Sequence, residues 1–83
     1  MMNKPRKAKI ESIQSKIETL RDELQELLDE EQEYFDNLPE NLQSGDRYEA
    51  SEEAIDALTE GVDNLESTVS NLQDIIDRWK STH

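Results

Sequence analysis

Apolar residues recur along the first half of the chain in steps of three and four, the heptad pattern of a helix that packs along another helix. One set of heptad positions holds Ile10, Ile17, Leu24, Glu31 and Leu38. The interleaved set holds Ile13, Leu20, Leu27 and Tyr34. Only Glu31 interrupts the apolar character. The pattern therefore predicts one long amphipathic helix over about residues 6–37, with both sets on one seam.

The second half of the chain repeats this pattern. One set of positions holds Tyr48, Ile55, Val62, Val69 and Ile76. The other set holds Ser51, Leu58, Leu65, Leu72 and Trp79. We therefore expect a second long amphipathic helix over about residues 47–80, and an all-α protein.

The stretch NLPENLQSGD, residues 37–46, separates the two helices. Pro39 disfavours helical dihedral angles at the residue before it, so the first helix should end near Asn37. Asp46 and Glu49 fit a capping box, so the second helix should begin near Arg47. A short loop at 38–46 predicts an antiparallel, coiled-coil-like helical hairpin, with residues 1–83 forming a single domain. The rival is one continuous helix, against which the proline and the glycine of this stretch count.

Further apolar or small residues flank each seam at heptad spacing. Beside the first seam these are Leu28, Phe35 and, within the expected loop, Leu42, which should join Leu38 in covering the loop end of the core. On the second helix they are Ala54, Gly61, Thr68 and Ile75. A lone chain of 83 residues, only 33% of them hydrophobic, buries little surface. We therefore expect hairpins to assemble into an oligomeric bundle, a dimer or larger.

Charge is sorted along the expected hairpin, although the whole chain has a net charge of −12. Residues 22–66 hold 17 acidic residues and one basic residue, a net charge of −16, and the remainder holds four acidic and eight basic residues, a net charge of +4. Folding back at the loop makes an acidic loop end and a basic open end. The acidic residues either form a solvated face or mimic the phosphate rows of DNA.

The basic open end is the candidate binding site. Arginine and lysine hold phosphate groups, and tryptophan can stack on a nucleotide base. The candidate residues for an anionic nucleotide are Arg6, Lys7, Lys9, Arg78, Trp79 and Lys80. The alternative is structural: basic residues favour helix C-termini and chain ends, and Trp79 occupies a seam position, where it would pack in the core.

Catalytic chemistry is not apparent in the sequence. The chain has no cysteine, its one histidine is His83, and no phosphate-binding loop or metal-ligand spacing occurs. We expect neither an enzyme nor a cofactor. We also expect no membrane span, a cytoplasmic location, and no direct nucleic-acid binding by so acidic a chain.

The loop region resembles a pattern found in small proteins of bacteriophage and prophage genomes. In that pattern a glutamate-rich helix runs into N-L-P-E-N-L-Q, then a polar stretch, then E-A-x-E-E-A-I-D-x-L. The matching residues are Asn37 to Gln43 and Glu49 to Leu58, within a resemblance that spans about residues 30–76. It implies a phage-type protein in the cytoplasm of a host cell, but it assigns no activity.

Three functions remain open. Phage anti-defence proteins that act as sponges for nucleotide immune signals are similar in size, helix content and lack of catalytic residues. That likeness favours an oligomer that sequesters a cyclic nucleotide or an ADP-ribose-type ligand. The alternatives are an acidic inhibitor or adaptor that binds a host protein, including as a DNA mimic, and a purely structural coiled-coil bundle.

Overall fold

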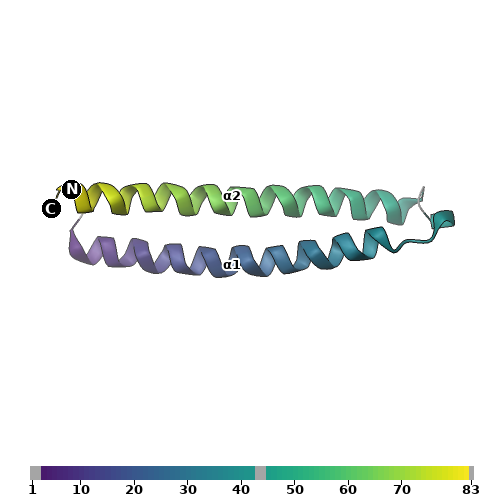
Figure 1. The fold of residues 1–83 in the computed structure, drawn as a ribbon, viewed down its shortest axis with the longest axis horizontal. Coiled ribbons are helices and arrows are strands. Elements are labelled where there is room, and N and C mark those ends of the chain that lie inside the picture. Colours follow the sequence, from purple (N-terminus) through teal and green to yellow (C-terminus); the bar gives the residue numbers. More distant parts are fainter. Residues whose placement is uncertain (1–2, 43–44, 83) are drawn as a thin grey trace.

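The protein is an antiparallel hairpin of two long helices (Figure 1). The computed structural model describes residues 3–42 and 45–82, with side chains described only as far as Trp79 in the second helix. Helix α1 spans Lys4–Asp36 and helix α2 spans Asp46–Thr82, with a short 3-10 helix, η1, at Glu40–Leu42 between them. The hairpin is a rod of 62 × 15 × 14 Å. The expected all-α hairpin is thus confirmed.

Local signals set the bounds of α1. The side chain of Asn3 caps its N-terminus by accepting a hydrogen bond of 3.0 Å from the backbone N–H of Arg6. Pro5 occupies the first turn, where a missing N–H removes no helical bond. At the other end the backbone N–H of Asn37 still bonds to the carbonyl of Glu33, and Pro39 then prevents the helix from continuing.

Helix α2 begins differently from the capping box expected at Asp46. Asp46 is already helical, and the backbone N–H of Glu49 donates to the carbonyl of Gly45. Gly45 therefore occupies the capping position, and the carboxylates of Asp46 and Glu49 lie in the first turn, where they interact favourably with the helix dipole. The expectation that Leu42 covers the loop end of the core together with Leu38 also needs correction. Leu38 is buried at the loop end, whereas Leu42 in η1 is 37% exposed.

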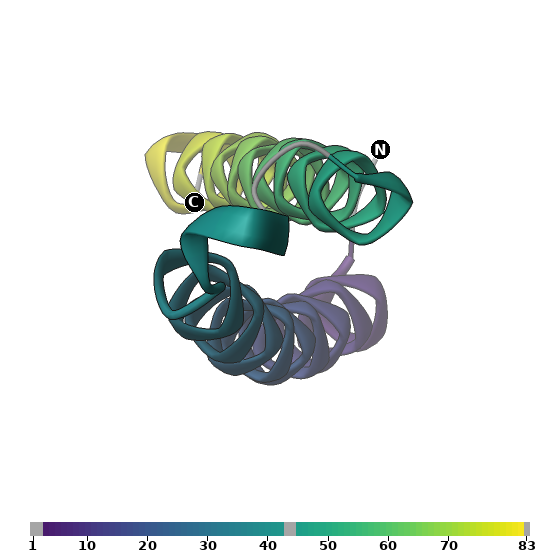
Figure 2. The same cartoon turned by 90° about the vertical axis from the view of Figure 1, so that its right-hand side faces the viewer.

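On α2 the two predicted sets of heptad positions face α1. All ten positions are buried or half-buried, and the most buried are Val62, Ile76 and Ser51. Gly61 flanks this seam, and a Cβ added there would lie 3.8 Å from a methyl carbon of Leu24. The two helices twist about each other along the rod, as the end-on view shows (Figure 2).

On α1 only one of the two predicted sets faces α2. Ile10, Ile17, Leu24, Glu31 and Leu38 are buried or half-buried, as expected. The prediction for Ile13, Leu20, Leu27 and Tyr34 is wrong, because these side chains are 49%, 52%, 52% and 46% exposed. Their expected places in the seam are taken by Lys7, Gln14, Arg21, Leu28 and Phe35, which are all half-buried.

The rotation of α1 has a physical cause at the loop end. Phe35 packs against Tyr48, with ring centroids 4.7 Å apart and planes inclined by 35°. Toward the open end, Gln14 Nε2 donates to the carbonyl of Val69 at 3.2 Å and to Oε1 of Gln73 at 3.0 Å. These contacts turn the column of Gln14, Leu28 and Phe35 toward α2, and the column of Ile13 and Tyr34 then turns away from it.

Candidate functional site

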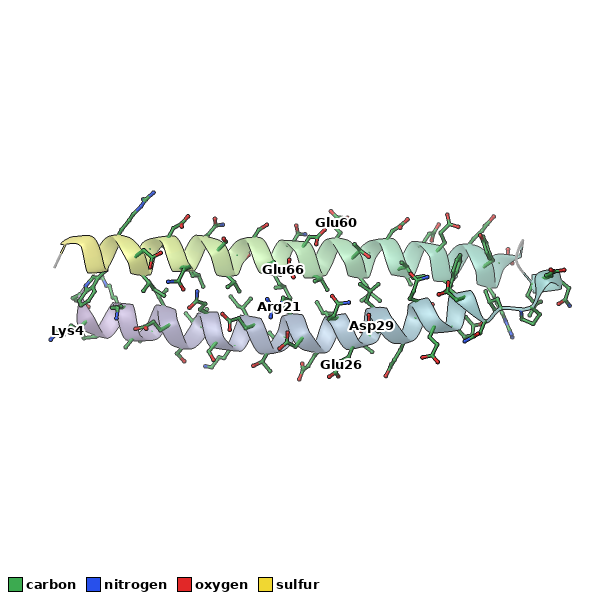
Figure 3. All side chains as sticks on the ribbon, in the orientation of Figure 1. Lys4, Arg21, Glu26, Asp29, Glu60 and Glu66 are labelled. Atoms are coloured by element: carbon green, nitrogen blue, oxygen red, sulfur yellow. The ribbon has the colours of Figure 1, made fainter. Side chains whose placement is uncertain are left out.

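The basic open end brings together the first two turns of α1 and the last turns of α2 (Figure 1). Lys4 marks this end in Figure 3, and Arg6 and Lys9 lie on the same two turns of α1. Arg78 and Trp79 come from α2. The hairpin thus collects cations from both ends of the sequence at one end of the rod.

Lys7 and Trp79 form the direct contact between the two groups. The Lys7 ammonium lies 4.8 Å from the centroid of the Trp79 ring, a cation–π geometry, and 3.2 Å from a carboxylate oxygen of Glu11. Both Lys7 and Trp79 are half-buried. Lys7 therefore covers one face of the ring, and a nucleotide base would have to stack on the other face or displace Lys7.

Arg6 and Lys9 do not point in the same direction as Lys7. Successive residues of a helix are rotated by about 100°, so Arg6 and Lys9 project from α1 in different directions from Lys7. Arg6, Lys9 and Arg78 are all exposed. The side chain of Lys80, the last of the predicted ligands, lies outside the described part of the chain. One hairpin therefore supplies a region of positive charge in which the contact of Lys7 with Trp79 joins the two helices.

The middle of the rod marks the border between the basic and acidic parts. The Asp22 carboxylate accepts hydrogen bonds from Nη2 and Nε of Arg21, at 3.0 and 3.3 Å. These bonds raise the pKa of the Arg21 guanidinium, and the negative charges of Glu66 and Glu18 act in the same direction. Figure 3 shows Arg21 and Glu66 on facing helices near mid-rod, with Glu26, Asp29 and Glu60 toward the loop end.

A second candidate site is the row of large apolar side chains that α1 turns toward solvent. We call Ile13, Leu20, Leu27 and Tyr34 the exposed stripe. Its members recur every seven residues, so they form one nearly straight column along the helix. Isolated exposed apolar residues are ordinary, but a continuous column along a rod is typical of an interaction surface.

Sequence reasoning did not identify the exposed stripe as a surface, because it placed these residues in the hairpin seam. The signal that could have found it is the number of apolar columns on the first helix. The first helix has three such columns. One contains Ile10, the second contains Ile13, and the third contains Leu28 and Phe35. One neighbouring helix can cover only part of so wide an apolar face, so one outer column had to remain uncovered.

Among residues 3–42 and 45–82, no group of three or more His, Cys, Asp or Glu side chains is arranged to hold a metal ion. In the same part of the chain, neither long helix contains a segment apolar and long enough to cross a membrane.

Comparison with known proteins adds no relative: no family model, no curated protein and no solved structure matches this chain.

Proposed function

We propose that this chain is a non-catalytic binding protein that works as a self-associated helical bundle, with the exposed stripe as its association surface. The observation that carries the proposal is the exposure of Ile13, Leu20, Leu27 and Tyr34 along one side of α1. A monomeric hairpin leaves this apolar column in water. Association removes it from water, which supplies a driving force in proportion to the apolar area covered.

That driving force is comparable in size to the cost of association. Full burial of a leucine or isoleucine side chain stabilises by about 1.5–3 kcal/mol, and each member of the stripe is about half exposed. Four such residues on each of two copies therefore contribute several kilocalories per mole. That gain can offset much of the cost of association, which is about 4–15 kcal/mol.

The test is sedimentation equilibrium of the natural chain and of the double variant Leu20→Gln, Leu27→Gln. We expect the natural chain to self-associate at micromolar concentration. The double variant should require at least a tenfold higher concentration, because two amides replace the centre of the apolar column. Circular dichroism should show unchanged helix content, since both side chains point away from α2.

The matched control replaces two polar residues that are also seven positions apart on α1, Gln25→Ala with Gln32→Ala. Both side chains are exposed and donate hydrogen bonds within α1, Gln25 to Asp29 and Gln32 to Asp36. Association should be unchanged in this control. A natural chain that stays monomeric at about 100 µM, or a control that dissociates as readily as the leucine variant, would contradict the proposal.

A second candidate function is sequestration of an anionic nucleotide at the basic open end, as expected for a phage anti-defence protein. It is favoured by the gathering of Arg6, Lys7 and Arg78 at one end of the rod. Phosphate groups form charge-assisted hydrogen bonds with such side chains, and binding without turnover needs no catalytic residue.

Titration calorimetry against cyclic dinucleotides, cyclic trinucleotides and cyclic ADP-ribose isomers tests this candidate. If it is correct, at least one of these probes binds more tightly than about 10 µM, and the variant Arg6→Ala, Arg78→Ala binds at least tenfold more weakly. A carboxylate variant at mid-rod, Asp22→Asn, is the control and should bind like the natural chain. Absence of binding across the whole panel would eliminate this ligand class.

A further inference from the structure

The two outer columns of the hairpin lie on the same side of the rod. Ile13 precedes the seam residue Gln14 by one position on α1, and Ala54 precedes the seam residue Ile55 by one position on α2. Both columns are therefore rotated from the seam by about 100° in the same sense. Because the helices face each other and run in opposite directions, equal rotation places both columns on one side.

The outer column of α2, which we call the α2 flank, consists of Ala54, Gly61, Thr68 and Ile75. The opposite side of the rod is polar. It carries the hydrogen bond of 3.0 Å between Gln14 and Gln73, and it carries Arg21 facing Glu66 (Figure 3). The hairpin thus has one side of apolar and small residues and one polar side.

The exposed stripe and the α2 flank are level with each other along the rod. Leu24 lies beside Gly61, and Gln14 lies beside Gln73. Counting in heptads from these contacts places Leu20 level with Thr68 and Leu27 level with Gly61, within about one helical turn. The midpoint of the stripe, between Leu20 and Leu27, therefore lies within about one helical turn of the midpoint of the flank.

The change of charge falls at the same midpoint. The half of the rod toward the loop contains residues 22–66, with a net charge of −16, and the half toward the open end has a net charge of +4. A second hairpin laid on this side in reversed orientation would place each acidic half against a basic half. In the same orientation it would place two blocks of −16 against each other.

We infer that a second copy of this chain docks on the side formed by the exposed stripe and the α2 flank, in reversed orientation, so that the acidic loop half of each hairpin lies against the basic open half of the other. This inference rests on the proposed self-association and specifies its geometry. Leu20 then meets Leu27 of the second copy, and Ile13 meets Tyr34 of the second copy. The result is an antiparallel four-helix bundle with two-fold symmetry.

The dimensions suit this partner. A side 62 Å long and 15 Å wide has an area of about 900 Å², close to the roughly 800 Å² that each partner buries in a standard stable interface. The α2 flank also pairs large with small residues in this arrangement. Ile75 meets Ala54 of the second copy, and Thr68 meets Gly61 of the second copy, so the two α2 helices can approach closely.

Charge decides whether the second copy docks in the same or the reversed orientation, because the charged helices of the two copies would lie close together. Packed helices lie about 8–10 Å apart, which is no longer than the screening length of about 10 Å at 0.1 M salt. Repulsion between two acidic halves is therefore only partly screened at moderate salt. Reversal replaces this repulsion with attraction, while covering the same apolar residues.

Intermolecular distances between spin labels test the orientation. The chain has no cysteine, so single labels can be attached at Ser12→Cys in the open half and at Glu23→Cys near the midpoint, both at exposed positions. In reversed docking, the labels at residue 12 of the two copies lie about 35 Å apart along the rod, from a rise of about 1.5 Å per residue. The labels at residue 23 should lie within about 20 Å.

The two labels separate the possible outcomes. A short distance at both residues 12 and 23 would show that the copies point the same way, which would overturn this inference and leave self-association intact. No intermolecular distance at residue 23, together with a monomer in sedimentation, would overturn both this inference and the proposed self-association. A long distance at residue 12 with a short one at residue 23 is the expected result.

Discussion

Replacing Ile76 by alanine should lower the free energy of unfolding by about 2–5 kcal/mol, the range for truncating a buried isoleucine. Ile76 is 2% exposed, the lowest value among the buried apolar side chains of the described residues. The truncation leaves a cavity between two helices that have few other neighbours to fill it. Urea unfolding followed by circular dichroism, at a fixed protein concentration, measures the change.

The adjacent isoleucine provides the matched control. Ile75 is 39% exposed on the α2 flank, so Ile75→Ala removes the same atoms from a site that is partly in water. At concentrations where the hairpin is monomeric, its effect should stay below about 1 kcal/mol. Equal effects of the two variants would show that α2 presents a different face to α1 in solution.

Measuring the free energy of unfolding of Ile75→Ala and Ile76→Ala at several protein concentrations links stability to assembly. If a second copy covers Ile75, the cost of Ile75→Ala should grow as protein concentration rises, because association stabilises the folded state by mass action. The cost of Ile76→Ala should change little, since that side chain is covered by α1 within one hairpin.

The helices and the turn could be predicted from sequence because local signals determine them. Heptad spacing identifies both helices, and Pro39 explains where α1 stops. The prediction of where α2 starts was less exact, since Gly45 rather than Asp46 takes the capping position. Asp46 and Gly45 are both common helix caps, so the preference of the residue alone does not separate them.

The rotation of α1 could not be predicted in the same way, because it depends on a competition between side chains far apart in sequence. Leu24 lies in the middle of three apolar columns, and either outer column could have turned toward α2. The stacking of Phe35 on Tyr48 favours one of them. Heptad spacing describes which residues share a column, but it carries no information about which column finds a better partner.

The basic open end was predicted from charge counting, whereas its internal geometry was not. The antiparallel hairpin brings the charged chain ends together, and that much follows from the sequence alone. The position of Lys7 over Trp79 depends on side-chain rotamers and on the exact stagger of the helices. This contact matters for function, because it covers a ring face that a nucleotide base would otherwise use.

Self-association and nucleotide binding compete for the same charges if the second copy docks in reversed orientation. The acidic loop half of that copy would lie near Arg6 and Arg78 and would partly neutralise them. A nucleotide bound at the open end would then weaken association, and association would weaken nucleotide binding by the same factor. Sedimentation with and without a bound nucleotide would show this coupling.

The polar pair in the seam leads to the second stability prediction. Ser51 is 3% exposed, and its hydroxyl donates a hydrogen bond of 2.6 Å to the carboxylate of Glu31, which occupies a heptad position of α1. Removing the donor alone, with Ser51→Ala, should lower the free energy of unfolding by about 1–3 kcal/mol, because the half-buried carboxylate loses a hydrogen bond.

Replacing both members of the pair should have the opposite effect. In the variant Glu31→Leu, Ser51→Ala, a leucine extends the column of Leu24 and Leu38, and no polar group remains unpaired. Apolar replacement of a buried polar pair is often neutral or stabilising, and burial of a leucine contributes about 1.5–3 kcal/mol. We expect a gain of about 1–3 kcal/mol over the natural chain, measured by urea unfolding of all four members of the double-mutant cycle. A double variant less stable than Ser51→Ala would mean that the seam cannot accommodate the larger apolar side chain in place of Glu31, and that Glu31 is held there by contacts other than Ser51.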